Sequence, residues 1–296
     1  MGFGCSPFRD GGRRVDLAGA VRAAVAAGYR LFDLAELYGN ERAVGEALRS
    51  PRAAPRSELF LVGKAWRTSF RPAALRQACE ASLRRLGCDA FDLYLLHAPE
   101  AWRHNGPLGE AAETGWEEHE RRAVPRDAQG NPELDDVPLA ETWEAMQDLV
   151  RRGLAGEIGV SNFSLPQIAE LGPRLPAANQ IEHLPHRPNA GIVDGSRRQG
   201  ILLMAHSPLS AAGLVAEPVL SVLSAISVSH RRSPAQIVLR WNVQHGLVPL
   251  PSSTDPGHIS ENLRALDFQL DGGAMAAMDS LAGAREPALH RQKPAS

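Results

Sequence analysis

The chain carries four side chains of the types that hold or transfer protons: a carboxylate, a phenol, an amine and an imidazole, at Asp33, Tyr38, Lys64 and His97. A phenol has an ordinary pKa of about 10, so it donates a proton poorly unless the anion that it leaves behind is stabilised. A lysine ammonium beside Tyr38 would supply that stabilisation. These residue types therefore indicate acid–base chemistry, on condition that the fold brings them together.

Each of the four also has an ordinary structural explanation when it is taken alone. Asp33 could cap the helix that follows it, and Tyr38 could be a loop aromatic. Lys64 could be exposed to solvent, and His97 could be a hydrogen-bonded core histidine. Their joint occurrence at the ends of consecutive apolar runs favours the functional interpretation.

The elements that must position these residues follow a regular alternation. Short apolar runs of strand type alternate with amphipathic stretches of helical period, which predicts βαβ units and a parallel sheet. The strands are expected at residues 1–4, 29–34, 59–62, 91–96, 156–160, 177–181, 200–205 and 247–250. Helices are expected at residues 15–27, 41–49, 72–86, 139–152, 165–171, 190–199 and 219–245.

Eight strands with intervening helices favour an α/β fold of the closed (β/α)8 TIM-barrel type, formed as a single domain by residues 1–296. An open doubly wound sheet is the competing fold. Its glycine fingerprint is incomplete here, because the stretch at residues 2–7 has proline in place of the third glycine and no acidic partner at the right distance.

Residues 99–138 form the one long segment without a helical or strand pattern, and they are rich in proline, glycine and charge. Such a segment at the end of the fourth strand predicts a lid loop. Its charged run at residues 117–122 lacks the second histidine of a zinc-protease helix, so we expect a solvated charged face.

In such a barrel the chemistry lies at the carboxyl ends of the strands. Nearly every polar residue that interrupts an apolar strand falls there, and these residues are Asp33, Lys64, His97, Ser161, Asn162, Gln180, His206, Ser207, Ser252 and Ser253. The sequence therefore predicts that one rim of the barrel collects the functional groups.

Composition and charge exclude several classes of protein. The 32 basic residues are balanced by 34 acidic ones, so the chain lacks the basic excess that nucleic-acid binding needs. No apolar run reaches the length of a membrane span, and no signal peptide is recognisable. Three cysteines without metal or redox spacing fit a reducing compartment. We expect a cytoplasmic protein that is a monomer or a weak oligomer.

Other motifs favour structural roles. Glu182, His183 and His186 are close enough to suggest a metal, but Pro185 interrupts them and no further ligand follows at a suitable spacing, so we expect no metal site. The common hydrolase and nucleotide-hydrolase motifs are absent from the sequence. An apolar stripe in the last predicted helix is expected to lie in the core, and consists of Leu220, Leu223 and Ile226.

Six segments, in order, resemble the aldo-keto reductase superfamily, and the resemblance runs from Gly2 to about Ala282. The segments are residues 31–41, 59–66, 92–99, 156–163, 179–182 and 249–262. The resemblance implies an NAD(P)H-dependent carbonyl reductase that acts on an aldehyde or a ketone. It makes Tyr38 the proton donor, Lys64 the stabiliser of the phenolate and Asp33 the partner of Lys64, with His97 hydrogen-bonded to the substrate carbonyl.

The same resemblance assigns a nicotinamide-binding set. Ser161, Asn162 and Gln180 would hold the carboxamide, and His206 would stack on the ring where the family commonly has a tyrosine. The remaining cofactor contacts are Ser207, Leu209, Ser210, Ser252, Ser253, Thr254, His258, Glu261 and Asn262. Ser252 and His258 stand where cations often hold the 2′-phosphate, so NADPH is expected but NADH is also plausible.

Two departures from the family pattern bear on substrate and function. Ser6 and Ala98 replace aromatic residues of the pocket, which leaves Trp66 as one apolar wall and a wider site for the small-molecule carbonyl. The family usually has an N-terminal hairpin that plugs the barrel, and here the sequence starts almost on the first strand, so we expect either that the plug is absent or that the given start is too late. The alternative to an enzyme is a non-enzymatic nucleotide-binding module or subunit on the same fold.

Overall fold

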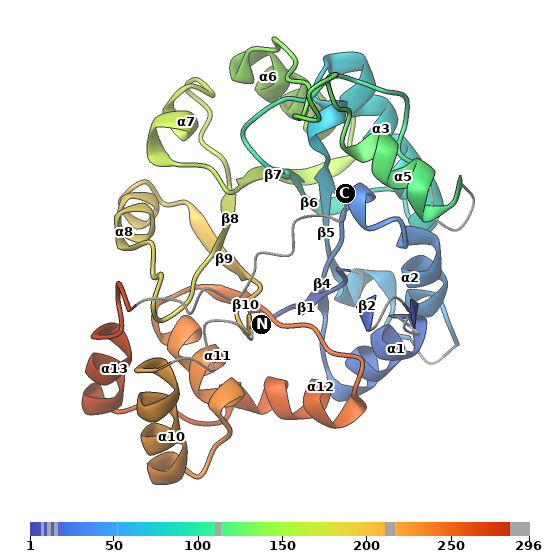
Figure 1. Cartoon of the computed structure of the whole chain (residues 1–296). Helices are drawn as coiled ribbons and strands as arrows, with labels where there is room; N and C mark the ends of the chain where they lie inside the picture. The colour runs from blue at the N-terminus through green and yellow to red at the C-terminus, as the bar shows by residue number, and fades with distance from the viewer. Residues whose placement is uncertain are drawn as a thin grey trace.

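The structure is a computed structural model that describes residues 1–284, except residues 7–8, 11–12, 15–16, 52, 110–113 and 211–216. Eight parallel strands form a ring (Figure 1), in the order β1 (Phe3–Gly4), β4 (Leu31–Asp33), β5 (Phe60–Ala65), β6 (Phe91–Leu96), β7 (Ala155–Ser161), β8 (Ala178–Glu182), β9 (Leu202–His206) and β10 (Val248–Leu250). The ring closes where the backbone N–H groups of Gly2 and Gly4 donate to the carbonyls of Pro249 and Pro251, both at 3.0 Å. The predicted (β/α)8 barrel is confirmed.

Helices surround the strands (Figure 1). They are α1 (Leu17–Ala27), α2 (Glu41–Leu48), α3 (Pro72–Leu86), α5 (Trp116–Ala123), α6 (Leu139–Arg151), α7 (Leu165–Ala169), α8 (Ala190–Arg198), α10 (Val219–His230), α11 (Pro234–Gln244), α12 (Pro256–Leu263) and α13 (Gly272–Asp279). Short 3₁₀ turns include η1 (Glu36–Tyr38), η2 (Arg56–Glu58), η3 (Arg67–Ser69) and η4 (Arg264–Leu266). A small antiparallel pair, β2 (Arg9–Asp10) and β3 (Arg13–Arg14), follows β1.

Local chemistry explains the best-predicted elements. Helix α3 begins with Pro72, whose missing N–H would have had no helical partner, and ends at Gly87. Gly87 adopts the left-handed conformation at φ 67° and donates to the carbonyl of Leu83. Helix α11 begins with a capping box between Ser233 and Gln236. The predicted bounds of α3 and β6 agree with the structure residue for residue.

The interior of the barrel is apolar at one level and polar at the next. The apolar level includes Leu31, Val62, Leu95, Ala178, Met204 and Leu250. Side chains two residues apart on a strand point to the same face. The positions two residues further on are therefore directed to the carboxyl rim, and they are Asp33, Lys64, His97, Gln180, His206 and Ser252. Because side chains alternate along each strand, six positions that are far apart in the sequence lie together at one rim of the barrel.

The prediction of one helix over residues 219–245 is wrong. Helix α10 ends at His230, Arg231 takes a left-handed conformation at φ 52°, and α11 starts at Pro234. The apolar stripe is also only partly buried, because Leu220 is 41% exposed while Leu223 and Ile226 are in the core. In a helix Val219 shares their face at spacings of four and seven residues, and Leu220 does not.

Residues 99–138 contain more structure than the sequence indicated. They hold α5 and two isolated antiparallel bridges, one of which joins Trp102 to Leu134. The prediction of a solvated charged face is wrong for His119, which is only 2% exposed. The acidic and basic neighbours of His119 pair with one another, as Glu118 does with Arg121 and Arg122. Those pairs lie on the outer side of α5, and the imidazole lies on the inner side.

The start of the first predicted helix, at residues 15–16, lies outside the described residues. Helices α12 and α13 had no counterpart in the sequence prediction. Among the described helices, none is both long and apolar enough to span a membrane. The three cysteine thiols are free, and two of them, Cys5 and Cys79, are buried.

Gly45 marks a close contact between α2 and the end of α3. A Cβ atom there would lie 2.3 Å from the backbone oxygen of Leu86, which cannot swing aside as a side chain would. We expect Gly45→Ala to lower the free energy of unfolding by about 2–3 kcal/mol. Gly191→Ala, in open space on α8, is the control and should raise it by about 0.5–1 kcal/mol. Urea unfolding of both variants decides the matter, and equal effects would contradict the contact.

Candidate active site

The centre of the polar rim is the ammonium group of Lys64, whose residue is 1% exposed. It donates to Oδ2 of Asp33 at 2.7 Å, to the carbonyl of Leu34 at 2.8 Å and to the hydroxyl of Tyr38 at 3.3 Å. Asp33 ends β4, Tyr38 ends η1, and Leu34 lies in the short connection between these two elements. One buried cation therefore connects the carboxylate and the phenol that the sequence analysis grouped with it.

Gln180 extends this cluster across the barrel. Its side-chain amide on β8 donates to Oδ1 of Asp33 at 2.7 Å, so both oxygens of that buried carboxylate have a donor. A buried carboxylate is costly unless its oxygens are paired. The cluster therefore joins three strands: Gln180 from β8, Asp33 from β4 and Lys64 from β5.

The electrostatics give Lys64 and Tyr38 definite protonation states. Burial lowers the pKa of Lys64, but attraction to Asp33 and Tyr38 more than offsets it, so the net pKa lies above the ordinary value. Burial raises the pKa of Tyr38, and this outweighs the opposing effect of the Lys64 charge. At neutral pH the amine is charged and the phenol keeps its proton.

His97 lies beside the phenol, with its ring edge-on to Tyr38 at a centroid distance of 5.8 Å and to Trp66 at 5.0 Å. Burial first, and then the Lys64 charge, holds the pKa of His97 well below its ordinary value, so the ring is neutral. Its Nδ1 atom is buried and has no hydrogen-bond partner in the described structure. The ring thus offers a neutral polar group beside the phenol.

Glu36 is a buried acid at this site that the sequence analysis missed. It lies on η1 and is 2% exposed; its Oε1 accepts the backbone N–H of Trp66 at 2.5 Å, and its side chain also bonds Ser69. Burial raises its pKa to about 7. The only signal in the sequence was its position between two apolar residues, Ala35 and Leu37.

Three of the predicted cofactor residues form a contiguous group at the ends of β7 and β9. The side-chain nitrogen of Asn162 donates to the carbonyl of His97 and to the hydroxyl of Ser161, both at 3.1 Å. The Asn162 side-chain oxygen lies 2.9 Å from Nε2 of His206. Asn162 and Ser207 both have positive φ, at 63° and 50°, a strain that concentrates at functional sites.

The other predicted cofactor residues surround the start of α12. Ser252, Ser253 and Thr254 are partly exposed, His258 is exposed and Asn262 is buried. Asp255 caps the helix by accepting the backbone N–H of His258 at 2.9 Å. Elsewhere, the carbonyl of Glu261 accepts from Gln236, and Ser210 donates its backbone N–H to Ser207. Leu209 packs against the core formed by α10, α11 and α13.

The predicted substrate-pocket residues differ in exposure. Ser6 is exposed, Trp66 is partly buried and Ala98 is buried. The indole nitrogen of Trp66 donates to the carbonyl of Ala123 at 2.7 Å. Trp66 therefore contacts both His97 of the polar rim and the end of helix α5.

The histidines that could have suggested a metal have other partners. The ring of His183 stacks on Trp241 at 4.4 Å, and its Nδ1 lies 2.9 Å from the side-chain oxygen of Asn242. Burial lowers the pKa of His183 to about 4. Within the described part of the chain, no three acidic, histidine or cysteine residues are grouped so as to hold a metal ion.

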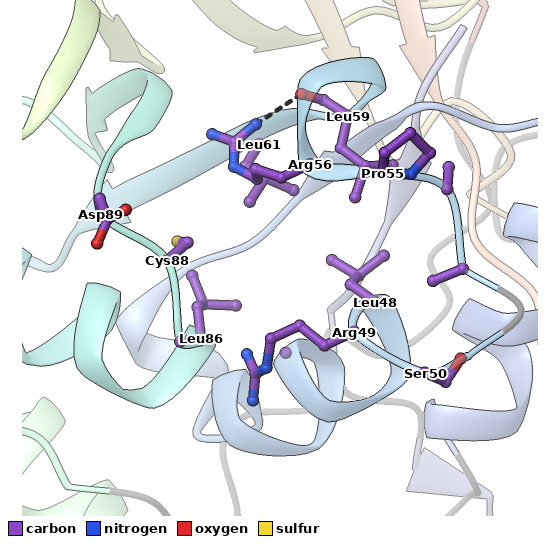
Figure 2. A pocket seen from close by; sticks show the side chains of 14 residues that line it. Leu48, Arg49, Ser50, Pro55, Arg56, Leu59, Leu61, Leu86, Cys88 and Asp89 are labelled. Atoms are coloured by element: carbon purple, nitrogen blue, oxygen red, sulfur yellow. Dashed lines mark hydrogen bonds between the residues drawn. The ribbon is translucent and has the colours of Figure 1, made fainter.

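A separate cavity lies at the other end of the barrel (Figure 2). It is lined by the ends of α2 and α3 and the start of β5, and has a volume of about 470 Å³. Leu48, Leu59 and Leu86 form apolar walls, and Arg56 is turned to the carbonyl of Leu59. Asp33, Tyr38, Lys64 and His97 do not line it, because they lie at the carboxyl ends of the strands.

Comparison with known proteins places this geometry in a family. The family model described as the Aldo/keto reductase family matches residues 1–282. The chain belongs to the aldo/keto reductase family. It is 34% identical over 277 residues to aldo-keto reductase family 1 member A1 of Mus musculus, which covers 88% of this chain and 80% of the mouse protein. It is 35% identical over 297 residues to dihydrodiol dehydrogenase 3 of Bos taurus, with 95% and 87% covered.

Solved structures of the family agree with the barrel. The aldose reductase from Schistosoma japonicum superposes with a TM-score of 0.83 at 33% identity, covering 96% of this chain and 89% of that one. The aldose reductase from Giardia lamblia gives 0.81 at 31% identity, with 94% and 90% covered. As a member of this family, the chain is an oxidoreductase of the carbonyl-reducing type.

Glu36 makes stability depend on pH. The unfolded carboxyl ionises at about 4.5 and the folded one at about 7, so the free energy of unfolding falls as pH rises between these values and stays low above them. Between pH 5 and pH 8 this effect lowers the free energy of unfolding by about 2 kcal/mol, and we expect Glu36→Gln to abolish that decrease. Urea unfolding at the two pH values measures it.

The control is Glu58→Gln, which removes a carboxylate whose side chain is 56% exposed. It should leave the pH dependence of stability as in the native chain. An unchanged pH dependence in Glu36→Gln would show that the Glu36 carboxyl ionises equally well in both states.

Proposed function

We propose that the protein is an NAD(P)H-dependent reductase of aldehydes or ketones in which Tyr38 donates the proton. The observation that carries this proposal is the contact of Lys64 Nζ with both Asp33 and the Tyr38 hydroxyl. Carbonyl reduction needs a hydride at carbon and a proton at oxygen. A phenol that is protonated at neutral pH, with a fixed cation against its oxygen, meets the second need.

The role of each residue follows from its charge state. When Tyr38 gives its proton to the carbonyl oxygen, a phenolate forms 3.3 Å from the Lys64 ammonium, which stabilises it. Asp33 keeps that ammonium in place. His97 is neutral, so it offers the substrate oxygen a hydrogen bond without adding a positive charge beside Lys64. Trp66 supplies the apolar wall.

The rim residues suit a nicotinamide. When bound, the reduced nicotinamide supplies the hydride. Its carboxamide both donates and accepts hydrogen bonds, as do the side chains of Ser161 and Asn162. Gln180 already donates to Asp33, so we assign the carboxamide first to the other two. We assign the stacking contact with the nicotinamide ring to His206, whose Nε2 lies 2.9 Å from the side-chain oxygen of Asn162.

The rival proposal is a binding module that holds a nucleotide without reducing anything. Substitutions at the expected nicotinamide and phosphate contacts, such as His206 and Ser252, favour it. The buried cluster favours an enzyme, because a binder gains nothing from a lysine placed against a phenol. Cofactor binding without turnover of any carbonyl in a broad panel would decide for the module.

Tyr38→Phe should lower kcat for aldehyde reduction by at least about a hundredfold, because the proton donor is lost. Cofactor affinity should change little. The matched control is Tyr94→Phe, which removes a buried hydroxyl that has no hydrogen-bond partner within the described structure. Steady-state kinetics and cofactor titration by fluorescence measure both. Full activity in Tyr38→Phe would refute the proton-donor role.

We also propose that the preference for NADPH over NADH is weak. A 2′-phosphate at the start of α12 would meet Ser252 and His258 in place of fixed cations, and it would meet the carboxylate of Asp255. The backbone N–H of His258 holds the pKa of Asp255 below its ordinary value, so this group is negative at neutral pH.

Asp255→Asn tests this view because asparagine also caps a helix. The variant should bind NADPH about three- to fivefold more tightly while NADH binding stays nearly constant, the effect of one screened charge. Asp271→Asn alters the corresponding cap of α13, where Asp271 accepts from Ala274, and should change neither. A strong native preference for NADPH that Asp255→Asn leaves unaltered would contradict the proposal.

A further inference from the structure

His119 on α5 is buried between two backbone carbonyls. Its Nε2 lies 2.8 Å from the carbonyl oxygen of Leu37, and its Nδ1 lies 3.0 Å from that of Gly109. The only ring against it in the described structure is Trp116, edge-on at 5.6 Å. The residue is 2% exposed, so water does not take part freely.

Two carbonyl oxygens require two donors. A carbonyl oxygen can only accept, whereas a neutral imidazole carries one N–H and one lone pair. A neutral ring in this position would aim a lone pair at an oxygen, whichever nitrogen held the proton. Both contacts are hydrogen bonds only when the ring carries both protons and a positive charge.

The charged groups on the neighbouring elements are engaged elsewhere. On η1, the carboxyl of Glu36 accepts from the backbone of Trp66, and on η3, Arg67 pairs with Glu100. On α5 itself, Glu118 pairs with Arg121 and Arg122, and the side chains of Glu117 and Glu120 are exposed to solvent. Within the described chain no carboxylate forms an ion pair with His119. The two carbonyls therefore supply the compensation for its charge.

The contact with Leu37 leads directly to the catalytic cluster. Leu37 lies in η1, immediately before Tyr38, and the η1 backbone orients the phenol toward Lys64. Further along α5, the carbonyl of Ala123 accepts from the indole of Trp66. Helix α5 is therefore fastened to the rim at two places, one beside Tyr38 and the other at the ring that contacts His97.

We propose that His119 is a positioning residue that, in its doubly protonated form, fastens α5 to the rim and fixes the backbone of Tyr38. Loss of one proton removes one of the two hydrogen bonds, so the fastening weakens as pH rises and the ring is neutralised. Its effect on turnover rests on the proposed function. The fastening itself is a property of the fold and can be measured without substrate.

The first experiment uses the native full-length chain with ¹⁵N-labelled histidine, and His119→Gln identifies the signals. At pH 6 both ring nitrogens of His119 should show the shifts of protonated imidazole. As pH rises one proton should be lost, and the amide protection factors of residues 36–38 and 116–123 should fall together with it. A neutral ring at pH 6, or protection factors that do not follow its titration, would overturn the proposal.

The second experiment separates positioning from general stability. His119→Gln should lower kcat/KM several-fold at pH 6 and little at pH 8, so that the part of the pH profile due to His119 is lost. His104→Gln is the control, because within the described structure the His104 ring has a single hydrogen-bond contact, from Nδ1 to the carbonyl of Thr68 at 2.8 Å, which a neutral ring satisfies. That variant should keep the native pH profile. An equal loss at both pH values in His119→Gln would indicate a structural role only and overturn the proposal.

The two experiments also distinguish this inference from the proposed function. If Tyr38→Phe proves fully active, the reductase mechanism fails, but the imidazole signals and protection factors still decide whether His119 fastens α5. If Tyr38→Phe is inactive and the His119 ring is neutral at pH 6, the mechanism stands and the fastening is refuted.

Discussion

A single buried cation organises this molecule. The ammonium of Lys64 lies inside a barrel whose next layer is apolar, where an uncompensated charge would cost several kcal/mol. Its three donors are all used, and each acceptor comes from the segment that includes β4 and η1. The requirement to satisfy one amine therefore fixes the position of a carboxylate, a backbone carbonyl and a phenol at once.

The same requirement spreads outward from Lys64. Asp33 needs a second donor and obtains it from Gln180 on the far side of the barrel, so a residue expected to bind cofactor also completes the ion pair. Burial is the main cause of the lowered pKa of His97, and the charge of Lys64 lowers this pKa further. In many proteins a buried ion pair can be replaced by apolar side chains without loss of stability. Stability alone therefore does not explain why this chain keeps the cluster, whereas the proposed proton transfer does.

The sequence was informative where local pattern and topology agree. Apolar strands followed by polar residues placed Asp33, Lys64 and His97 at one rim, because the strand period and the barrel leave no other arrangement. Glu36 and His119 were missed for the opposite reason. Their neighbours in sequence are ordinary for a turn and for a charged helix, and only packing between elements far apart in the chain buries them. The break between α10 and α11 was not predicted, because both helices contribute apolar residues to the same core and their sequences read as one continuous apolar pattern.

The closure of the barrel has a mechanical consequence. In a parallel ladder the N–H and C=O of one residue face the same neighbouring strand. Pro249 and Pro251 accept from Gly2 and Gly4 but have no N–H to return, so the junction between the first and last strands has only half of the usual bonding. The closure is therefore the weak point of the barrel's hydrogen-bonded ring. An outward pull on the first strand would part this junction first, and the seven other junctions would keep all eight strands joined.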